Sequence, residues 1–264
     1  MLRELDPFGH ATTYEEENVT LTNHFDLPSW TFASVEALGA GDPRLCGGKF
    51  NGPAYPNSTC HGGSTKNHHD VSLQGYRGKP VFMCEGHDLW RSWWQAKEPN
   101  VVRAAWAVTT AAASFTWTDL GHAPDEPYLS SQTFATYPAA AHAIDVVAHI
   151  MTKEVPAFYS MVPADELLVQ PVPELTFCLA EHGAQYIVYS DAGAPFTLQT
   201  DSVAVSNPDD LDRPVQNFNL SWFDAASGAK VPGGLCSTSS AGRILLTPPQ
   251  VGVHWVAMLL RIAR

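Results

Sequence analysis

Hydrophobic residues in the first part of the chain recur in short runs that alternate with helical patterns. The runs predict strands over residues 10–17, 30–38, 80–85 and 114–119. Residues 99–113, which are rich in Ala and begin with Pro99, predict a helix, as do the apolar spacings of three and four over residues 137–155. This alternation of strands and helices is typical of a parallel α/β sheet or barrel.

From about residue 165 the pattern changes to strands alone. A Pro-rich linker is followed by five apolar segments, TFCLAEHGAQYIVYSD, PFTLQT, FNLSWFDAASGAKV, RILLTPP and HWVAMLLRI. Turn residues separate the strands, and we expect Asp224 and Gly228 to bracket a tight reversal. The pattern predicts an all-β sandwich over residues 165–264, after an α/β region over residues 1–164.

Residues 39–70 interrupt the first region with a segment rich in Gly, Pro and Asn, which predicts a long loop. A loop of this length inside a compact domain is usually functional or disordered. Its His61, His68 and His69, with Cys60 and Asp70, do not have the spacing of a compact zinc site. We therefore expect no metal and no cofactor.

Composition narrows the class of protein. The chain is 45% hydrophobic and 16% charged, as expected of a packed globular protein, and its net charge of −12 excludes nucleic acid as a partner. No run approaches the roughly 18 apolar residues of a membrane span. The amino terminus has no signal-peptide pattern, so localisation stays open, and Cys46 and Cys60 could pair only in an exported protein.

One strand carries the first candidate for chemistry. The apolar run of residues 80–85 ends on Glu85, with His87, Asp88 and Trp90 directly behind it. Glu85 is either a solvated charge at a strand end or a carboxylate placed to react.

A family resemblance favours the second interpretation. In order, the resemblance lies in LRELDPFGHATTY, GKPVFMCEGHDLW, VVRAAWAVTTAAASFTW, ATYPAAAHAIDVVAHIM and the YIVYS…FTL…WFD…G pattern of the last region. These segments resemble the carboxy-terminal half of apiosidase-like glycoside hydrolases. Those enzymes have a (β/α)₈ barrel of the TIM type, followed by a small β-sandwich described as collagen-binding-like.

The resemblance implies a fold and a reaction. Residues 10–14, 30–36, 80–85 and 114–118 would be strands five to eight of the barrel, followed by the sandwich. Glu85 would be the nucleophile of a retaining glycoside hydrolase, which attacks the anomeric carbon. Retention needs a second carboxylate about 5–5.5 Å away as acid/base. Such barrels carry it on strand four, which would precede Met1, so we expect a partial barrel.

Other residues would complete the sugar site. Trp90 and Trp117 offer flat aromatic faces to sugar rings, and His87 and Asp88 would line the rim. Glu15 and Glu17, with Glu16 between them, would bind sugar hydroxyls or supply a substitute acid/base. The loop histidines are expected at the rim of the same cleft.

The expected function is glycoside hydrolysis of a plant or microbial polysaccharide, by this chain or by a longer protein of which it is the carboxy-terminal portion. The alternative is a non-catalytic carbohydrate- or matrix-binding protein in which the sandwich carries the function. In a third possibility, a second copy of the chain or a partner subunit completes the barrel and covers its open face.

Overall fold

The computed structural model describes residues 15–16, 33–36, 69–70, 72–73, 81–85, 98–115, 138–200 and 215–262. The chain divides into two compact units, Met1–Ala141 and His142–Arg264. The domain boundary expected between residues 164 and 165 falls inside the second unit and stays a prediction.

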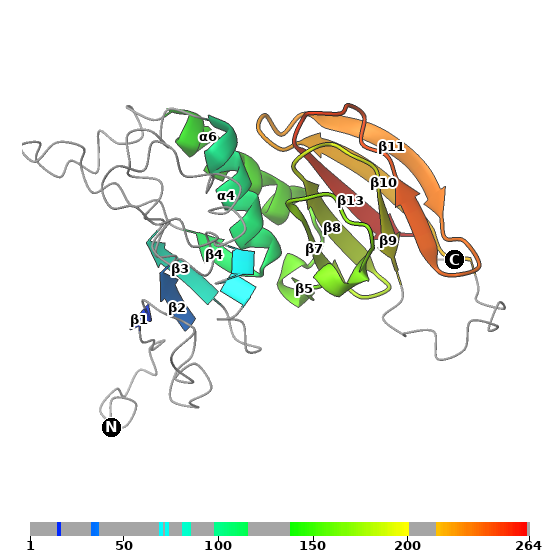
Figure 1. Ribbon diagram of the computed structural model, residues 1–264, viewed down its shortest axis with the longest axis horizontal. Coiled ribbons are helices and arrows are strands. Elements are labelled where there is room, and N and C mark those ends of the chain that lie inside the picture. Colours follow the sequence, from blue (N-terminus) through cyan, green and yellow to red (C-terminus); the bar gives the residue numbers. More distant parts are fainter. Residues whose placement is uncertain are drawn as a thin grey trace, which may run out of the picture. The chain divides into compact units, whose positions relative to one another are not determined.

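The first unit contains a parallel four-stranded sheet in the order β1-β2-β3-β4 (Figure 1). Its strands are β1 (Glu15–Glu16), β2 (Ala33–Glu36), β3 (Val81–Glu85) and β4 (Ala113–Phe115). Every strand pairs with the next one along the sequence, and each pair is parallel. A strand falls in each of the four predicted ranges, with β4 beginning one residue early, and the rest of each range lies outside the described residues. Because successive strands are parallel, the chain needs a crossover connection between them.

Helix α4 (Glu98–Thr110) connects β3 to β4 and confirms the helix expected over residues 99–113. Ala112 takes a left-handed backbone, φ 57°, which ends the helix before β4 begins. Trp106 is fully buried together with its small neighbours Ala104, Ala105 and Ala107. Alanine on both sides of a tryptophan lets the helix pack closely, so Trp106 belongs to the core.

Helix α6 (Pro138–His149) continues into a π-helical turn, η4 (Ile150–Glu154), and together they confirm the helix expected over residues 137–155. Ala143, Val146 and Ile150 are buried at spacings of three and four, which is one face of a helix. Within the second unit, Lys230 Nζ lies 2.6 Å from Glu154 Oε2 and so joins this turn to a strand.

The second unit is built on two antiparallel sheets, ordered β11-β10-β13-β8-β7-β5 and β12-β9-β6. The strands of the larger sheet are β5 (Val162–Pro163), β7 (Thr176–Glu181), β8 (Gln185–Ser190), β10 (Asn217–Asp224), β11 (Lys230–Ser237) and β13 (Trp255–Arg261). Those of the smaller sheet are β6 (Leu168–Val169), β9 (Phe196–Gln199) and β12 (Arg243–Leu246). The predicted strands of this region are all present.

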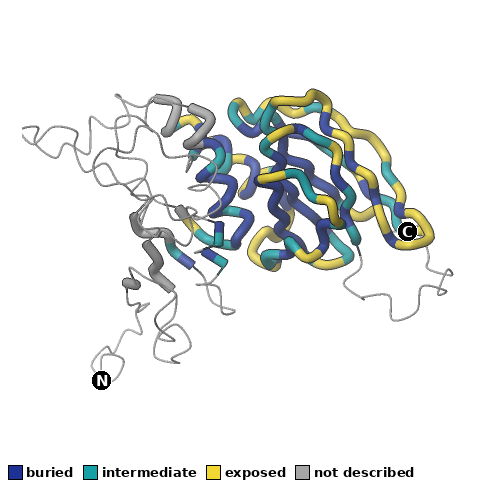
Figure 2. The backbone as a smooth tube through the Cα atoms, in the orientation of Figure 1, coloured by how far each residue is buried: buried dark blue, intermediate teal, exposed yellow. Residues whose placement is uncertain are grey.

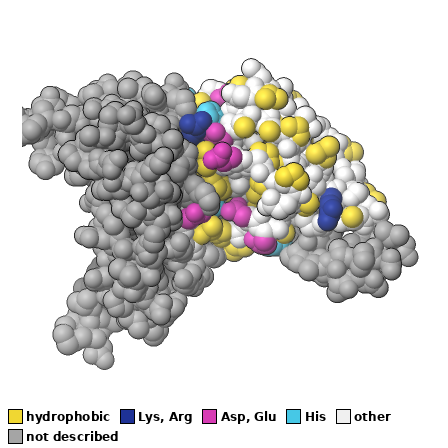
Figure 3. Space-filling view, viewed as in Figure 1, with side chains coloured by type: hydrophobic (Ala, Val, Ile, Leu, Met, Phe, Trp, Pro, Cys, Tyr) yellow, Lys and Arg dark blue, Asp and Glu magenta, His cyan; other side chains and the backbone are white. Residues whose placement is uncertain are grey.

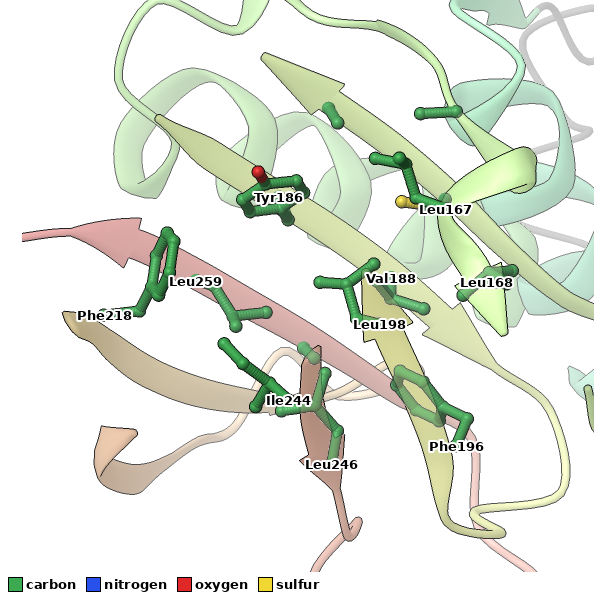
Figure 4. Packing of buried hydrophobic residues seen from close by; sticks show 14 of the residues in the cluster. Leu167, Leu168, Tyr186, Val188, Phe196, Leu198, Phe218, Ile244, Leu246 and Leu259 are labelled. Carbon is green, nitrogen blue, oxygen red and sulfur yellow. The ribbon is translucent and has the colours of Figure 1, made fainter. Parts of the chain in front are cut away.

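Alternate residues of both sheets meet in one hydrophobic core (Figure 4). Phe196, Leu198, Ile244 and Leu246 come from β9 and β12 of the smaller sheet. From the larger sheet the core takes Cys178, Ala180, Tyr186, Val188, Phe218, Trp222, Trp255, Ala257 and Leu259. Figure 2 shows the inner strands of this unit buried and β11 largely exposed. Because successive side chains point to opposite faces of a strand, every second residue of each strand faces this core.

Two short strands, β5 (Val162–Pro163) and β6 (Leu168–Val169), were not predicted, and both lie before the segment PVPEL that was interpreted as a linker. They are accompanied by the 3₁₀ turns η5 (Phe158–Ser160) and η6 (Asp165–Leu167). The Ala164 N–H donates to the Cys178 carbonyl at 2.8 Å, and the Cys178 N–H donates to Asp165 Oδ1 at 2.7 Å. These bonds make residues 162–169 part of the β-rich unit.

The predicted reversal between β10 and β11 is confirmed. Asp224 Oδ1 accepts hydrogen bonds from the N–H groups of Ala226 and Ser227 at 3.1 and 2.7 Å, and Gly228 has φ +72°. Among the described helices, none is long and apolar enough to cross a membrane.

Candidate active site

Acidic residues stand at one edge of the parallel sheet in the first unit. Strands β1, β2 and β3 end at Glu16, Glu36 and Glu85, and all three run in the same direction. The carboxyl ends of parallel strands therefore bring three glutamate positions to the same edge. In α/β barrels and open α/β sheets this is the edge at which ligands bind.

The backbone register places two of these positions side by side. Val35 pairs with Met83, but the next residue of β2, Glu36, pairs with Glu85. The register shift makes Cys84 the extra residue of a β-bulge, so Glu85 arrives directly opposite Glu36. Neighbouring strands lie about 4.8 Å apart. Bulges are common beside active sites because they change the positions that a strand presents.

Glu85 thus occupies the position in the fold that the sequence predicted for it, the end of a parallel strand. Glu15 begins β1. The other predicted site residues, Glu17, His87, Asp88, Trp90 and Trp117, lie outside the described residues. The roles assigned to all of these residues stay predictions.

Glu36 was missed at the sequence level. It ends the apolar segment TFASVE as Glu85 ends PVFMCE. The rule that singled out Glu85, a carboxylate closing a strand, would have singled out Glu36 as well. The sequence pattern does not indicate which residues of β2 and β3 pair, because the bulge determines that register.

A pair of carboxylates at neighbouring strand ends can divide acid and base chemistry between them. Within the described part of the chain, no three His, Cys, Asp or Glu side chains are grouped to hold a metal ion.

The expectation that His69 lines a cleft rim is wrong. Its side chain is 1% exposed, and its Nδ1 lies 2.7 Å from the carbonyl oxygen of Ala107 in α4. Residues 69 and 70, assigned to the loop, are helical. A buried imidazole bonded to the backbone stabilises the packing of this short helical segment against α4. His61 and His68 lie outside the described residues.

The β-rich unit holds a second polar group, formed by Tyr189, Asp191 and His254. His254 Nδ1 lies 2.7 Å from Asp191 Oδ1, and the Tyr189 hydroxyl donates to the same oxygen at 3.0 Å. The Tyr189 and His254 rings are stacked, with their centroids 6.4 Å apart. These contacts connect the end of β8 to His254, the residue before β13. The group therefore has a structural role.

On the described surface seen in Figure 3, hydrophobic side chains lie scattered among other side chains. Among the described residues, Phe158 and Tyr159 in the turn η5 are exposed, at 43% and 83%. Their ring centroids lie 6.1 Å apart in an edge-on arrangement.

Comparison with known proteins shows which solved structures have a similar fold. Neither the family models nor the curated proteins compared with the sequence give a match. A solved glycoside hydrolase superposes with TM-score 0.64 at 14% identity, over 96% of this chain and 57% of its own. A glycoside hydrolase family 5 protein from Bacteroides vulgatus gives 0.65 at 14%, over 98% and 57%. Another glycoside hydrolase from that organism gives 0.58 at 13%, over 98% and 46%.

The chain therefore spans about half the length of these structures, 57% of the first two and 46% of the third. At such low identity the likeness shows the fold, which is mixed α/β and rich in sheet, and which these glycoside hydrolases share.

Proposed function

We propose that the protein acts as a retaining glycoside hydrolase, with Glu85 as the nucleophile. The observation that carries the proposal is the position of Glu85 at the carboxyl end of a parallel strand, in a fold shared with solved glycoside hydrolases. An ionised carboxylate there attacks the anomeric carbon and forms a glycosyl-enzyme ester, which water then hydrolyses.

The finer architecture belongs to the same proposal. Strands β1 to β4 act as strands five to eight of a TIM-type barrel, and their sequential parallel order supports this assignment. The two antiparallel sheets act as a collagen-binding-like β-sandwich. Trp90 and Trp117 stack on sugar rings, and His87, Asp88, Glu15 and Glu17 bind hydroxyl groups of a plant or microbial polysaccharide.

The remaining strands of such a barrel come from a longer chain, a second copy or a partner subunit. Light scattering on the purified chain tests whether a second copy supplies them. A dimer supports a second copy, and a stable, active monomer contradicts the need for any partner.

Substitution of Glu85 tests the proposed reaction. Glu85→Gln removes the nucleophile with little change in volume, so hydrolysis of a panel of aryl glycosides should fall by more than about a thousandfold. Glu174→Gln, at an exposed position of the β-rich unit, is the matched control and should keep wild-type rates. Unchanged hydrolysis by Glu85→Gln would exclude it as the nucleophile.

The exposed aromatic turn favours the alternative function, carbohydrate or matrix binding by the β-rich unit. A tyrosine at 83% exposure beside a partly exposed phenylalanine offers apolar faces to a sugar. Under this alternative, Tyr159→Ala weakens retention on insoluble polysaccharide or collagen, while Glu85→Gln leaves retention unchanged. Equal retention of Tyr159→Ala and wild type would remove the support that this turn gives.

A further inference from the structure

One short segment of the β-rich unit is exposed along its whole length. Residues 156–160, with the sequence PAFYS, are all exposed, and two of them, Phe158 and Tyr159, are aromatic. Tyr159 leaves 83% of its surface in solvent and Phe158 leaves 43%. Single exposed apolar residues are common on protein surfaces, but two neighbouring aromatic rings in one turn indicate a contact surface for a ligand.

The backbone holds this turn in one conformation. Ala157, directly before η5, has a left-handed backbone with φ 48°, which is unfavourable for a residue other than glycine. Its carbonyl oxygen accepts from the Ser160 N–H at 2.9 Å, from the Ser160 hydroxyl at 2.7 Å and from Gln185 Nε2 at 3.4 Å. Phe158 and Tyr159 also contact each other edge to face. Because the rings are ordered in advance, binding of a ligand loses less conformational entropy.

A carboxylate lies beside the turn. Gln185 is 4% exposed, and its Nε2 donates to Glu181 Oε2 at 2.9 Å as well as to the Ala157 carbonyl. Glu181 is the partly exposed last residue of β7, which pairs antiparallel with β5, the strand that follows the turn. The buried amide of Gln185 therefore connects the aromatic turn to the carboxylate and fixes both.

These groups match the chemistry of a neutral sugar polymer. An exposed phenol ring stacks on the C–H face of a pyranose, and a carboxylate accepts hydrogen bonds from sugar hydroxyls. An acidic polysaccharide fits less well, since Glu181 and the net charge of −12 would repel it. A stable protein partner would need a surface of roughly 800 Å² on each side. The hydrophobic side chains on the described face in Figure 3 are scattered instead, which favours a small ligand unit such as a sugar.

We propose that Tyr159, Phe158 and Glu181 form a non-catalytic site for neutral polysaccharide. Tyr159 stacks on a pyranose ring, Phe158 supports it from the side, and Glu181 accepts hydrogen bonds from the hydroxyl groups. The proposal rests on the alternative function of carbohydrate binding by the β-rich unit, and it adds the class of ligand and the polar partner of the aromatic turn. Binding at this site requires no hydrolysis by Glu85.

Depletion of the full chain from solution by microcrystalline cellulose, insoluble xylan and insoluble mannan tests the site. Wild type should bind at least one of these polymers, and Tyr159→Ala should weaken that binding by about tenfold or more, because the stacking face is lost. Tyr159→Phe keeps the face and should stay within about threefold of wild type. Glu181→Gln removes the charged acceptor and should weaken binding by about three- to tenfold.

Val251→Ala is the matched control, because it shortens a side chain that is 73% exposed in a different loop of the same unit. It should bind as wild type does, and a loss equal to that of Tyr159→Ala would overturn the inference. Melting temperatures show whether each variant has folded, and Glu181→Gln tests the site independently if Tyr159→Ala has not.

The other outcomes are equally decisive. Wild-type binding to none of the three polymers, or only to calcium polygalacturonate or fibrillar collagen, would overturn the inference. Equal binding by wild type and a folded Tyr159→Ala or Glu181→Gln would overturn it as well. Because depletion needs no turnover, hydrolysis of aryl glycosides by wild type decides the proposed reaction separately.

Discussion

Two glycines in the β-rich unit show what the absence of a side chain contributes. Gly193 and Gly252 both have left-handed backbones, with φ of +58° and +79°. The Gly252 N–H donates to the Ala192 carbonyl at 2.8 Å, so their two loops are hydrogen-bonded. A Cβ on Gly193 would overlap the Gln250 carbonyl oxygen and lie 2.8 Å from that of Val253, whereas a Cβ on Gly252 would meet nothing within 4 Å.

These environments predict different costs for the same substitution. Gly252→Ala should lower the free energy of unfolding by about 1–2 kcal/mol, because only the left-handed backbone opposes it. Gly193→Ala should cost about 1–3 kcal/mol more, because backbone atoms must also move. Urea denaturation of both variants measures the difference, and equal costs would contradict the close approach at Gly193.

Tyr186 places a hydroxyl inside the hydrophobic core. It donates to the Thr200 carbonyl and accepts from the Gly183 N–H at 2.7 Å, and its ring is fully buried. Tyr186→Phe leaves both backbone groups without this partner and should lower the free energy of unfolding by about 1–3 kcal/mol. Tyr159→Phe, at 83% exposure, is the control and should change it by less than about 0.5 kcal/mol.

Cysteine reactivity follows burial. Burial raises the pKa of the Cys178 thiol well above its ordinary value, with Asp165 and Glu166 adding to the shift, and burial also raises the pKa of the half-buried Cys236. The folded state keeps the Cys178 thiol protonated, whereas the unfolded chain can ionise it. The free energy of unfolding therefore falls as the pH rises above the ordinary pKa of a thiol.

We therefore expect iodoacetamide at mildly alkaline pH to label Cys236 before Cys178 in the folded protein. Peptide mass spectrometry should find Cys178 alkylated only after urea is added. Equal labelling rates for the two cysteines in the folded protein would contradict the burial of Cys178.

At the scale of elements, the reversal from β10 to β11 depends on one side chain. Asp224 Oδ1 accepts from two backbone N–H groups and from the Ser227 hydroxyl, the last at 2.9 Å. Asp224→Ala should lower the free energy of unfolding by about 1–2 kcal/mol, by analogy with the loss of a helix N-cap. Asp224→Asn keeps an acceptor oxygen and should cost less, and a thermal melt in which both variants lose equally would contradict this role.

The sequence predicts elements better than it predicts their register. Strands with a clear period of two and the helix around Trp106 could be placed because their patterns are local. The two-residue strands β5 and β6 could not, since no periodicity fits into two residues and their pairing with β7 and β9 comes from distant sequence.

The candidate site shows the same limit. The position of Glu85 at a strand end follows from an apolar run that stops on a carboxylate. Its pairing with Glu36 depends on the bulge at Cys84. The two paired strands are far apart in the sequence, since Glu36 at the end of β2 and Val81 at the start of β3 lie 45 positions apart. His69 resembles a polar loop residue in sequence, and only the fold shows it buried against Ala107.

At the scale of the whole molecule, the start of the β-rich unit can be tested by fragments. A fragment of residues 138–264 keeps α6, η4 and β5, whereas one of residues 165–264 loses the buried Met161 and Ala164 and uncovers the edge of β7. We expect the longer fragment to unfold cooperatively and the shorter one to melt more than about 10 °C lower. Equal melting temperatures would support a boundary at residue 165.

The central claim is that Glu85 bonds covalently to the sugar. Dinitrophenyl 2-deoxy-2-fluoroglycosides form the glycosyl-enzyme faster than it hydrolyses, because fluorine destabilises both positively charged transition states while the leaving group favours the first step. Incubation of the chain with a panel of these compounds, followed by peptide mass spectrometry, should find one glycosyl unit on Glu85 and none in Glu85→Gln. The absence of an adduct on Glu85, or an adduct on a different residue, would contradict the account.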